Sequence, residues 1–328
     1  MLLSTPLTKR LGITHPVLLA PMDLVADARL AAAVSGAGGL GLLGGGYGEE
    51  RWLARELGLL AESRVRFGVG FITWSLARQP SLLDLALEAK PVAVMLSFGD
   101  PTPFLERSKR AGAAVICQVQ TLALAREAVA AGADILVAQG TEAGGHGASR
   151  GLVSLLPEIC DAVGAGVPVV AAGGLADARG LAAALLLGAS GVLMGTRFYA
   201  TREAAGADAA KERIRAASGD QTARSIVFDI AKRHVWPDPL FTARTLRNPY
   251  YERWAGREAD LVRHLDAEAA SYAQARSAGD FDIAAVTAGE AVGLIHEIQP
   301  VRDLIPDLVR GAAALLQAGP PQVERVDG

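Results

Sequence analysis

The first two hundred residues repeat one pattern: a short apolar run, then Gly or Pro, then an amphipathic segment rich in Ala, Leu and Arg. The apolar runs scarcely alternate with polar residues, which is typical of strands buried on both faces in parallel sheets. We expect strands at 17–20, 39–43, 66–71, 93–97, 113–119, 135–138, 167–172 and 191–194. We expect helices between them at 26–35, 49–62, 76–88, 101–111, 121–131, 153–164 and 176–187.

Eight strand-and-helix steps in series predict an α/β fold, the (β/α)8 TIM barrel. A doubly wound open sheet is the alternative, and it usually carries a Gly-rich phosphate-binding turn after its first strand. Here the first strand ends in Ala20-Pro21-Met22-Asp23, which is no such turn. The barrel is therefore favoured.

The repeated pattern stops near residue 204. Residues 204–298 carry more charge and include Trp236 and Trp254, and an apolar helical stripe resumes at 301–317. We expect a helical subdomain at 204–298 that covers the barrel mouth, with the barrel formed by 1–203 and 299–328. The inserted segment could line the pocket, cover it or form a dimer interface, and we favour a cover that also contributes to a homodimer.

Composition excludes several functional classes. The formal net charge is −3, which gives no electrostatic basis for binding nucleic acid or an anionic membrane. The apolar runs are too short to span a bilayer, and the first residues do not read as a signal peptide. Cys117 and Cys160 lie in apolar segments, so we expect buried thiols in a reducing cytoplasm rather than a disulfide framework or a metal site.

Two small-residue turns lie at the ends of the last two expected strands. Gly173-Gly174 precede a helix whose N-cap is Ala176 or Asp177, and Gly195-Thr196 open the next helix. Such glycines often only punctuate helix boundaries. Two such turns on neighbouring strands, however, favour a cradle of backbone N–H groups for phosphate, which barrels commonly bind at this position.

The stretch AQGTEAGGHGASRG, residues 138–151, follows the sixth expected strand. Its glycines would let the backbone approach a flat ligand, and Gln139 would offer it an amide. A lone histidine is usually structural, but His146 lies in a Gly-rich loop at the active face of a barrel, which favours proton transfer. Glu142 either orients this loop or is solvated.

Two further strand ends point to the same ligand. Pro21-Met22 either pack or form the floor beneath a flat ring, and Gln118 is a second amide. Together these strand ends predict a phosphorylated, flat, hydrogen-bonding cofactor.

These motifs resemble the nitronate monooxygenases, formerly called 2-nitropropane dioxygenases. The resemblance runs in order along nearly the whole chain. It rests on Pro21-Met22, AVSGAGGLGLLGGG, QGTEAGGHGASRG, AAGGLADARG, VLMGTRF, ARTLRNPYYERWAG and GEAVGLIHEI. The set EAGGH, AAGG and MGTRF is specific for this superfamily and less specific for the reaction that a member performs.

The resemblance implies an FMN-dependent barrel that oxidises alkyl nitronates with O2 to a carbonyl compound and nitrite, with His146 as the catalytic base and no metal. Many members have Asn where this chain has Gly70, which leaves the substrate preference open. The expected cofactor-binding residues are Pro21, Met22, Gln118, Gln139, Ala143, Gly144, Gly145, Gly173, Gly174, Met194, Gly195 and Thr196.

Several alternatives stay open on the sequence. The same flavin barrel could reduce quinones or enoyl-acyl carrier protein with NAD(P)H, and a non-catalytic flavin-binding protein is a further alternative. A barrel without flavin could instead hold a phosphorylated sugar or amine. A barrel dehydrogenase with a catalytic cysteine is disfavoured, because the loop after the sixth expected strand contains His146 and no cysteine.

Overall fold

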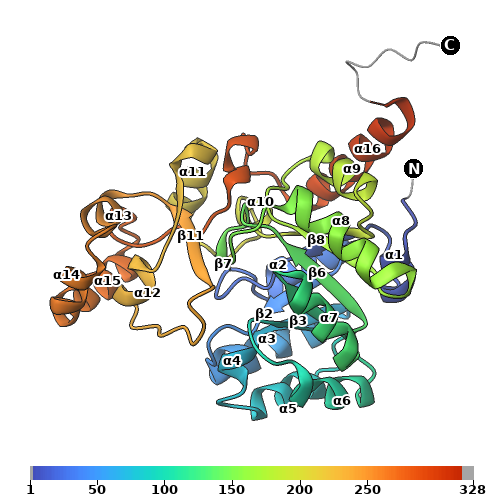
Figure 1. The fold of residues 1–328 in the computed structure, drawn as a ribbon, viewed down its shortest axis with the longest axis horizontal. Coiled ribbons are helices and arrows are strands. Elements are labelled where there is room, and N and C mark those ends of the chain that lie inside the picture. The colour runs from blue at the N-terminus through green and yellow to red at the C-terminus, as the bar shows by residue number, and fades with distance from the viewer. Residues whose placement is uncertain (1–2, 320–328) are drawn as a thin grey trace.

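The computed structural model describes residues 3–319, and its centre is a parallel eight-stranded sheet (Figure 1). The strand order is β1-β9-β8-β6-β5-β4-β3-β2, and a parallel bridge between Leu18 and Leu40 closes the sheet into a barrel. The (β/α)8 prediction and all eight expected strands are confirmed. The strands are β1 (Val17–Leu19), β2 (Gly41–Gly44), β3 (Phe67–Ile72), β4 (Ala93–Ser97), β5 (Ala114–Val119), β6 (Ile135–Gln139), β8 (Val169–Ala172) and β9 (Gly191–Met194).

The strands bury both faces, which explains their nearly uniform apolar sequences. One cluster fills the barrel interior and includes Leu18, Met95 and Val137. A larger cluster lies between the strands and the surrounding helices. Helix α1 (Pro6–Leu11), which sequence reasoning did not anticipate, contributes Leu7 and Leu11 to the interior cluster.

The helices between the strands form the outer layer, with α16 packed on α9 and α2. Asp27 and Thr121 are the N-caps of α2 and α7, as their side-chain oxygens accept a backbone N–H. The helices of this layer are α2 (Ala28–Gly36), α3 (Glu50–Ser63), α4 (Thr73–Leu76), α5 (Ser81–Glu88), α6 (Thr102–Arg110), α7 (Leu122–Ala131), α8 (Leu152–Val163), α9 (Ala178–Leu186), α10 (Thr196–Tyr199) and α16 (Val301–Ala318).

The segment 204–298 is not wholly helical, which corrects the sequence-based description. It contains β10 (Thr222–Ser225) and β11 (Thr242–Leu246), which form an antiparallel sheet with β7 (Gly145–Gly147) of the barrel loop. Its helices gather on one side of the barrel (Figure 1), where Phe228, Tyr250, Trp254 and Tyr272 form part of a separate small core. The helices are α11 (Asp208–Ala216), α12 (Val227–Ala231), α13 (Pro249–Trp254), α14 (Glu258–Arg263) and α15 (Leu265–Ala278).

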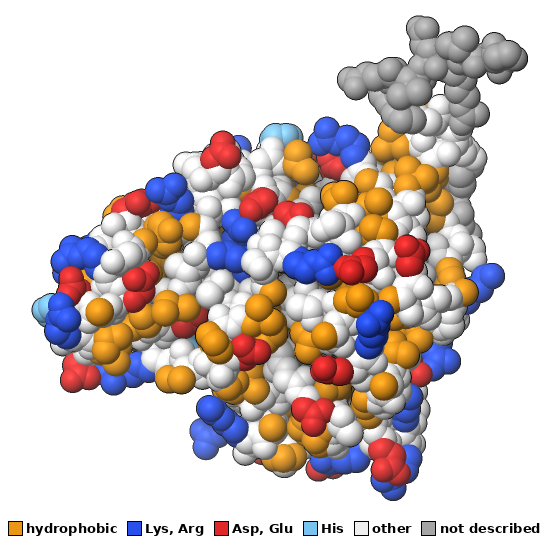
Figure 2. All heavy atoms as spheres, in the orientation of Figure 1, with side chains coloured by type: hydrophobic (Ala, Val, Ile, Leu, Met, Phe, Trp, Pro, Cys, Tyr) orange, Lys and Arg blue, Asp and Glu red, His pale blue; other side chains and the backbone are white. Residues whose placement is uncertain are grey.

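The charged residues form no single-sign field on the face shown in Figure 2, where basic and acidic side chains are interspersed. Within residues 3–319, none of the helices is long and apolar enough to cross a membrane. The same part of the chain contains no cluster of three His, Cys, Asp or Glu side chains suited to a metal ion.

Candidate active site

Most residues expected to bind a cofactor gather at one end of the barrel. They lie at or beyond the C-terminal ends of parallel strands, and these ends share one rim because the strands run in the same direction. The strands are mostly buried, whereas the rim residues are partly exposed. The structure places on this rim Pro21, Met22, Gln118, Ala143, Gly144, Gly145, His146, Gly173, Gly174, Gly195 and Thr196.

His146 lies in β7 and pairs with Ala243 of β11. Its Nε2 is 2.9 Å from Oδ2 of Asp229 in α12, and the two side chains are only 11% and 6% exposed. Burial lowers the pKa of His146, and the hydrogen bond and charge of Asp229 offset part of that effect. The imidazole is therefore neutral near neutral pH and able to accept a proton.

Aromatic side chains cover His146. The indole of Trp236 stacks on the imidazole, with ring centroids 3.5 Å apart and planes inclined by 16°. The ring of Phe98 lies 5.1 Å from that of Trp236, and its backbone has φ of +64°, which is strained for a bulky residue. We call the following group the aromatic cluster: Tyr47, Trp74, Phe98, Trp236 and Phe241. It shields one face of the histidine from water.

The small residues of the 138–151 loop make room for other parts of the protein. A Cβ on Gly144 would lie 2.7 Å from backbone atoms of 288–289, and one on Gly147 would lie 2.8 Å from Nη2 of Arg224. Gly145 has φ of +73°, a conformation that favours glycine. Protein backbone fills the space where a Gly144 side chain would lie, and the expectation that this stretch lies beside a flat ligand stays a prediction.

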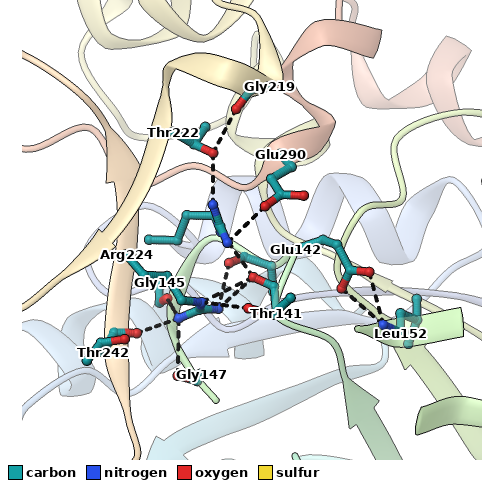
Figure 3. A network of polar contacts seen from close by, with 12 residues as sticks. Thr141, Glu142, Gly145, Gly147, Leu152, Gly219, Thr222, Arg224, Thr242 and Glu290 are labelled. Atoms are coloured by element: carbon teal, nitrogen blue, oxygen red, sulfur yellow. Dashed lines mark hydrogen bonds and ion pairs between the residues drawn. The ribbon is translucent and has the colours of Figure 1, made fainter. Parts of the chain in front are cut away.

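Arg224 of β10 holds this loop in shape (Figure 3). Its guanidinium is buried, and burial together with the charge of Arg244 lowers its pKa to about 10, so it stays protonated at neutral pH. Arg244 adds a hydrogen bond to the carbonyl of Thr141 at 3.0 Å and an ion pair with Glu290 at 2.9 Å. The guanidinium of Arg224 donates to the carbonyl oxygens of Thr141, Ala143, Gly145, Gly147 and Thr242.

Gln139 is engaged inside the protein. Its Oε1 accepts from Nε2 of Gln118 at 3.2 Å and from Nε2 of Gln120 at 2.8 Å. Its own Nε2 donates to the carbonyl oxygen of His146 at 3.0 Å. Gln139 therefore supports the histidine, and the half-buried Gln118 is the better placed of the two expected amides for a ligand.

Two turns of the rim present free backbone amides. Gly173 and Gly174 have φ of +101° and +71°, and Gly195 is the N-cap of the short helix that begins at Thr196. None of these four amides donates a hydrogen bond to another residue in the range 3–319. Free N–H groups on neighbouring strands are the donors that an anionic phosphate requires, so the residues present fit a phosphorylated cofactor.

Two carboxylates fix the flanking helices. Asp177, not Ala176, is the N-cap of α9 and accepts from the amides of Arg179 and Gly180. Both oxygens of Glu142 accept from the amide of Leu152 at the start of α8, at 3.0 and 3.1 Å (Figure 3). Glu142 is therefore an orienting residue of the loop and not merely solvated.

The space expected for a side chain at position 70 is filled by Pro21. A Cβ on Gly70 would clash with the Pro21 ring, so Gly70 is explained by the segment that follows β1. The Met22 sulfur lies 3.5 Å from where a Cβ of Gly195 would be, which links the ends of β1 and β9. Met194 is 1% exposed within the core, and its carbonyl oxygen accepts the amide of Ala20, so it lies beneath the rim rather than on it.

Sequence reasoning missed the residues that surround His146. Asp229, Trp236 and Arg224 lie about eighty to ninety positions further along the chain, in the inserted segment. The aromatic content of that segment was the only signal for them. Asp23, directly after Met22, was also overlooked, and burial and the charge of Glu49 raise its pKa to about 6.

Comparisons with known proteins show the family of this chain. The nitronate monooxygenase family model matches residues 4–62 and 72–311. Nitronate monooxygenase npaC of Metarhizium robertsii is 36% identical over 92% of this chain and 91% of its own. A (3aS,4S,5R,7aS)-5-hydroxy-7a-methyl-1-oxo-octahydro-1H-indene-4-carboxyl-CoA dehydrogenase of Mycobacterium tuberculosis is 32% identical, covering 99% of this chain and all of that one.

A solved structure shows the same architecture. FabK of Thermotoga maritima superposes with a TM-score of 0.85 at 33% identity, covering 96% of this chain and 98% of that one. The family match extends over most of the barrel and all of the inserted segment. This chain therefore belongs to the nitronate monooxygenase family and is a flavin-dependent oxidoreductase.

Proposed function

We propose that this protein oxidises alkyl nitronates with O2 to a carbonyl compound and nitrite, with FMN as its flavin. The observation that carries the proposal is the state of His146. It is a neutral, nearly buried imidazole, bonded through Nε2 to a carboxylate, on the rim where the free amides lie. The similarity to nitronate monooxygenases over nine-tenths of the chain supports the same reaction.

The rim residues would hold FMN by its two ends. The amides of Gly173, Gly174, Gly195 and Thr196 would bind the phosphate. The ring would lie near Pro21 and Met22 and the half-buried Gln118, with the backbone of Ala143, Gly144 and Gly145 beside it. When bound, FMN accepts electrons from the substrate and passes them to O2.

The protein's own contribution is position and proton control. His146 is held by Asp229 on its edge and by Trp236 on its face, so the imidazole has one orientation. The aromatic cluster excludes water from that face, which strengthens hydrogen bonds to a bound substrate. Arg224 binds carbonyl oxygens of the 141–147 loop, and this fixes the position of the imidazole relative to the rim.

A second function is favoured by the structural neighbour. FabK is an enoyl reductase, and its similarity to this chain extends over almost the whole of both chains. NAD(P)H-dependent reduction of an enoyl-acyl carrier protein or a quinone on the same barrel is therefore the alternative.

The proposal also includes a cytoplasmic location, and a homodimer to which the 204–298 segment contributes.

The test is the absorbance spectrum of the purified protein, recorded without oxygen before and after addition of ethyl nitronate. We expect a yellow protein whose flavin is bleached by the nitronate and restored by air. Bleaching by NAD(P)H and not by the nitronate would support the reductase. A colourless protein that FMN cannot reconstitute would refute the flavin proposal.

A further inference from the structure

We propose that Asp229 is a positioning residue that keeps the proton of His146 on Nε2, so that Nδ1 is the basic atom, and that the pair makes neutral nitroalkanes substrates. This inference rests on the proposed function. It goes further in naming the basic atom, the residue that sets it and the form of the substrate that needs the base.

The contact geometry assigns the tautomer. A carboxylate only accepts hydrogen bonds, so the 2.9 Å contact between Asp229 Oδ2 and His146 Nε2 requires a proton on Nε2. Nδ1 of His146 has no hydrogen-bond partner among the described residues. It is also absent from their fully buried polar atoms, so it retains some exposure. It is therefore the ring nitrogen that a substrate can reach.

Asp229 is rigidly supported. It lies in α12, whose Val227 and Phe228 are at most 1% exposed in the small core. Its carbonyl accepts the amide of His234 at 2.9 Å. Its second carboxylate oxygen, Oδ1, is buried without a partner. A buried carboxylate with a free oxygen has spare capacity to stabilise a cation, and His146 is the ring it contacts.

The charges around His146 favour a base that is neutral at rest. Burial lowers its pKa most, and Lys232 and Arg224 lower it further, while Asp229 raises it. His234, on the same side of the site, also has a pKa lowered by burial and by Lys232. The imidazole is therefore unprotonated and available as a base at neutral pH, and the imidazolium formed on proton transfer is held beside the Asp229 carboxylate.

The corresponding reaction is a balanced proton transfer. The Cα–H bond of a neutral nitroalkane breaks, its proton goes to Nδ1, and its electron pair moves into the nitro group to give a nitronate within the site. A substrate that arrives as a nitronate has already lost this proton and needs no base. The pair of His146 and Asp229 thus suits the neutral acid.

The experiment compares two forms of one substrate on the FMN-loaded protein. We expect wild type to turn over both nitroethane and preformed ethyl nitronate. Asp229→Asn should lower kcat/KM for nitroethane by about 100-fold or more, because the amide no longer enforces the tautomer, and for the nitronate by less than about 10-fold. Asp208→Asn, the same change at an exposed carboxylate, should leave both unchanged.

Equal losses on both substrates would overturn the inference and leave the proposed function standing. Failure of wild type to oxidise the nitronate would refute both. A second measurement needs no variant. Nitroethane with both Cα hydrogens replaced by deuterium should react more slowly than nitroethane with wild type, by a normal primary isotope effect. The nitronates prepared from the two compounds should show no such difference. Turnover of nitroethane no faster than its spontaneous ionisation would overturn the inference.

Discussion

Replacing Gly70 by alanine tests how tightly the floor of the site is built. Gly70 lies in the middle of β3, which is paired with β2 on one side and with β4 on the other. A Cβ at this position would lie closer than 3.0 Å to two atoms of the Pro21 ring. The ring is rigid and lies two residues after the end of β1, so the clash cannot be relieved by a change of rotamer.

The expected magnitude follows from that geometry. Inserting a methyl group into packed surroundings typically costs about 1–3 kcal/mol. Because backbone or ring must move here, we expect Gly70→Ala to lower the free energy of unfolding by about 2–3 kcal/mol. Gly58→Ala is the matched control. It adds the same methyl group in α3 with no atom within 4 Å, and should stabilise by about 0.5–1 kcal/mol.

The assay is urea unfolding followed by circular dichroism, together with the flavin content of each purified variant. Gly70→Ala should also retain less flavin, because Pro21 is displaced, and Gly58→Ala should retain all of it. Adding Pro21→Gly to Gly70→Ala removes the clashing ring atoms, so the double variant should lose less stability than the sum of the single losses. A Gly70→Ala protein as stable as wild type would refute the steric account.

Two further predictions concern the supports of the site. Arg224→Gln leaves several loop carbonyls without a donor, so we expect a loss of about 2–4 kcal/mol and reduced flavin retention after desalting. Unchanged retention would contradict the role given to Arg224. Asp177→Ala removes the N-cap of α9 and should cost about 1 kcal/mol at neutral pH. Burial opposes ionisation of Asp177, but hydrogen bonds from Arg179 and Gly180 outweigh it and hold its pKa below its usual range. The stability difference should therefore be present above pH about 4 and disappear as the pH falls through the folded pKa of Asp177.

The barrel was predictable because its signal is local. Strands such as 93–97 and 135–139 are apolar on both faces, and each is followed by an amphipathic helix with its own boundary residues. The two small-residue turns at Gly173 and Gly195 were identifiable for the same reason, since barrel strands always end on the same rim. Each of these elements is determined by residues within a few positions of it in the sequence.

The loop at 138–151 shows where such reasoning fails. The sequence suggests that its glycines make room for a ligand, but at Gly144 and Gly147 the atoms that a Cβ would meet belong to 288–289 and Arg224. The strand β7 forms only because β11 pairs with it, about a hundred residues later. Contacts at that separation leave no periodic pattern in the sequence. The sequence around His146 therefore does not indicate whether Asp229 contacts its side chain.

The barrel and the inserted segment contribute different parts of the site, which bears on how relatives with different activities share one fold. The rim amides that suit a phosphate come from β8 and β9, whereas Asp229, Trp236 and Arg224 come from 204–298. Changes in the insertion can therefore alter the basicity, access and orientation of His146 without disturbing the rim amides. A family member that keeps the rim glycines but lacks a carboxylate against this histidine should still bind flavin. It should, however, require a substrate that is already ionised or a donor that delivers hydride, because no partner would stabilise a proton taken from carbon.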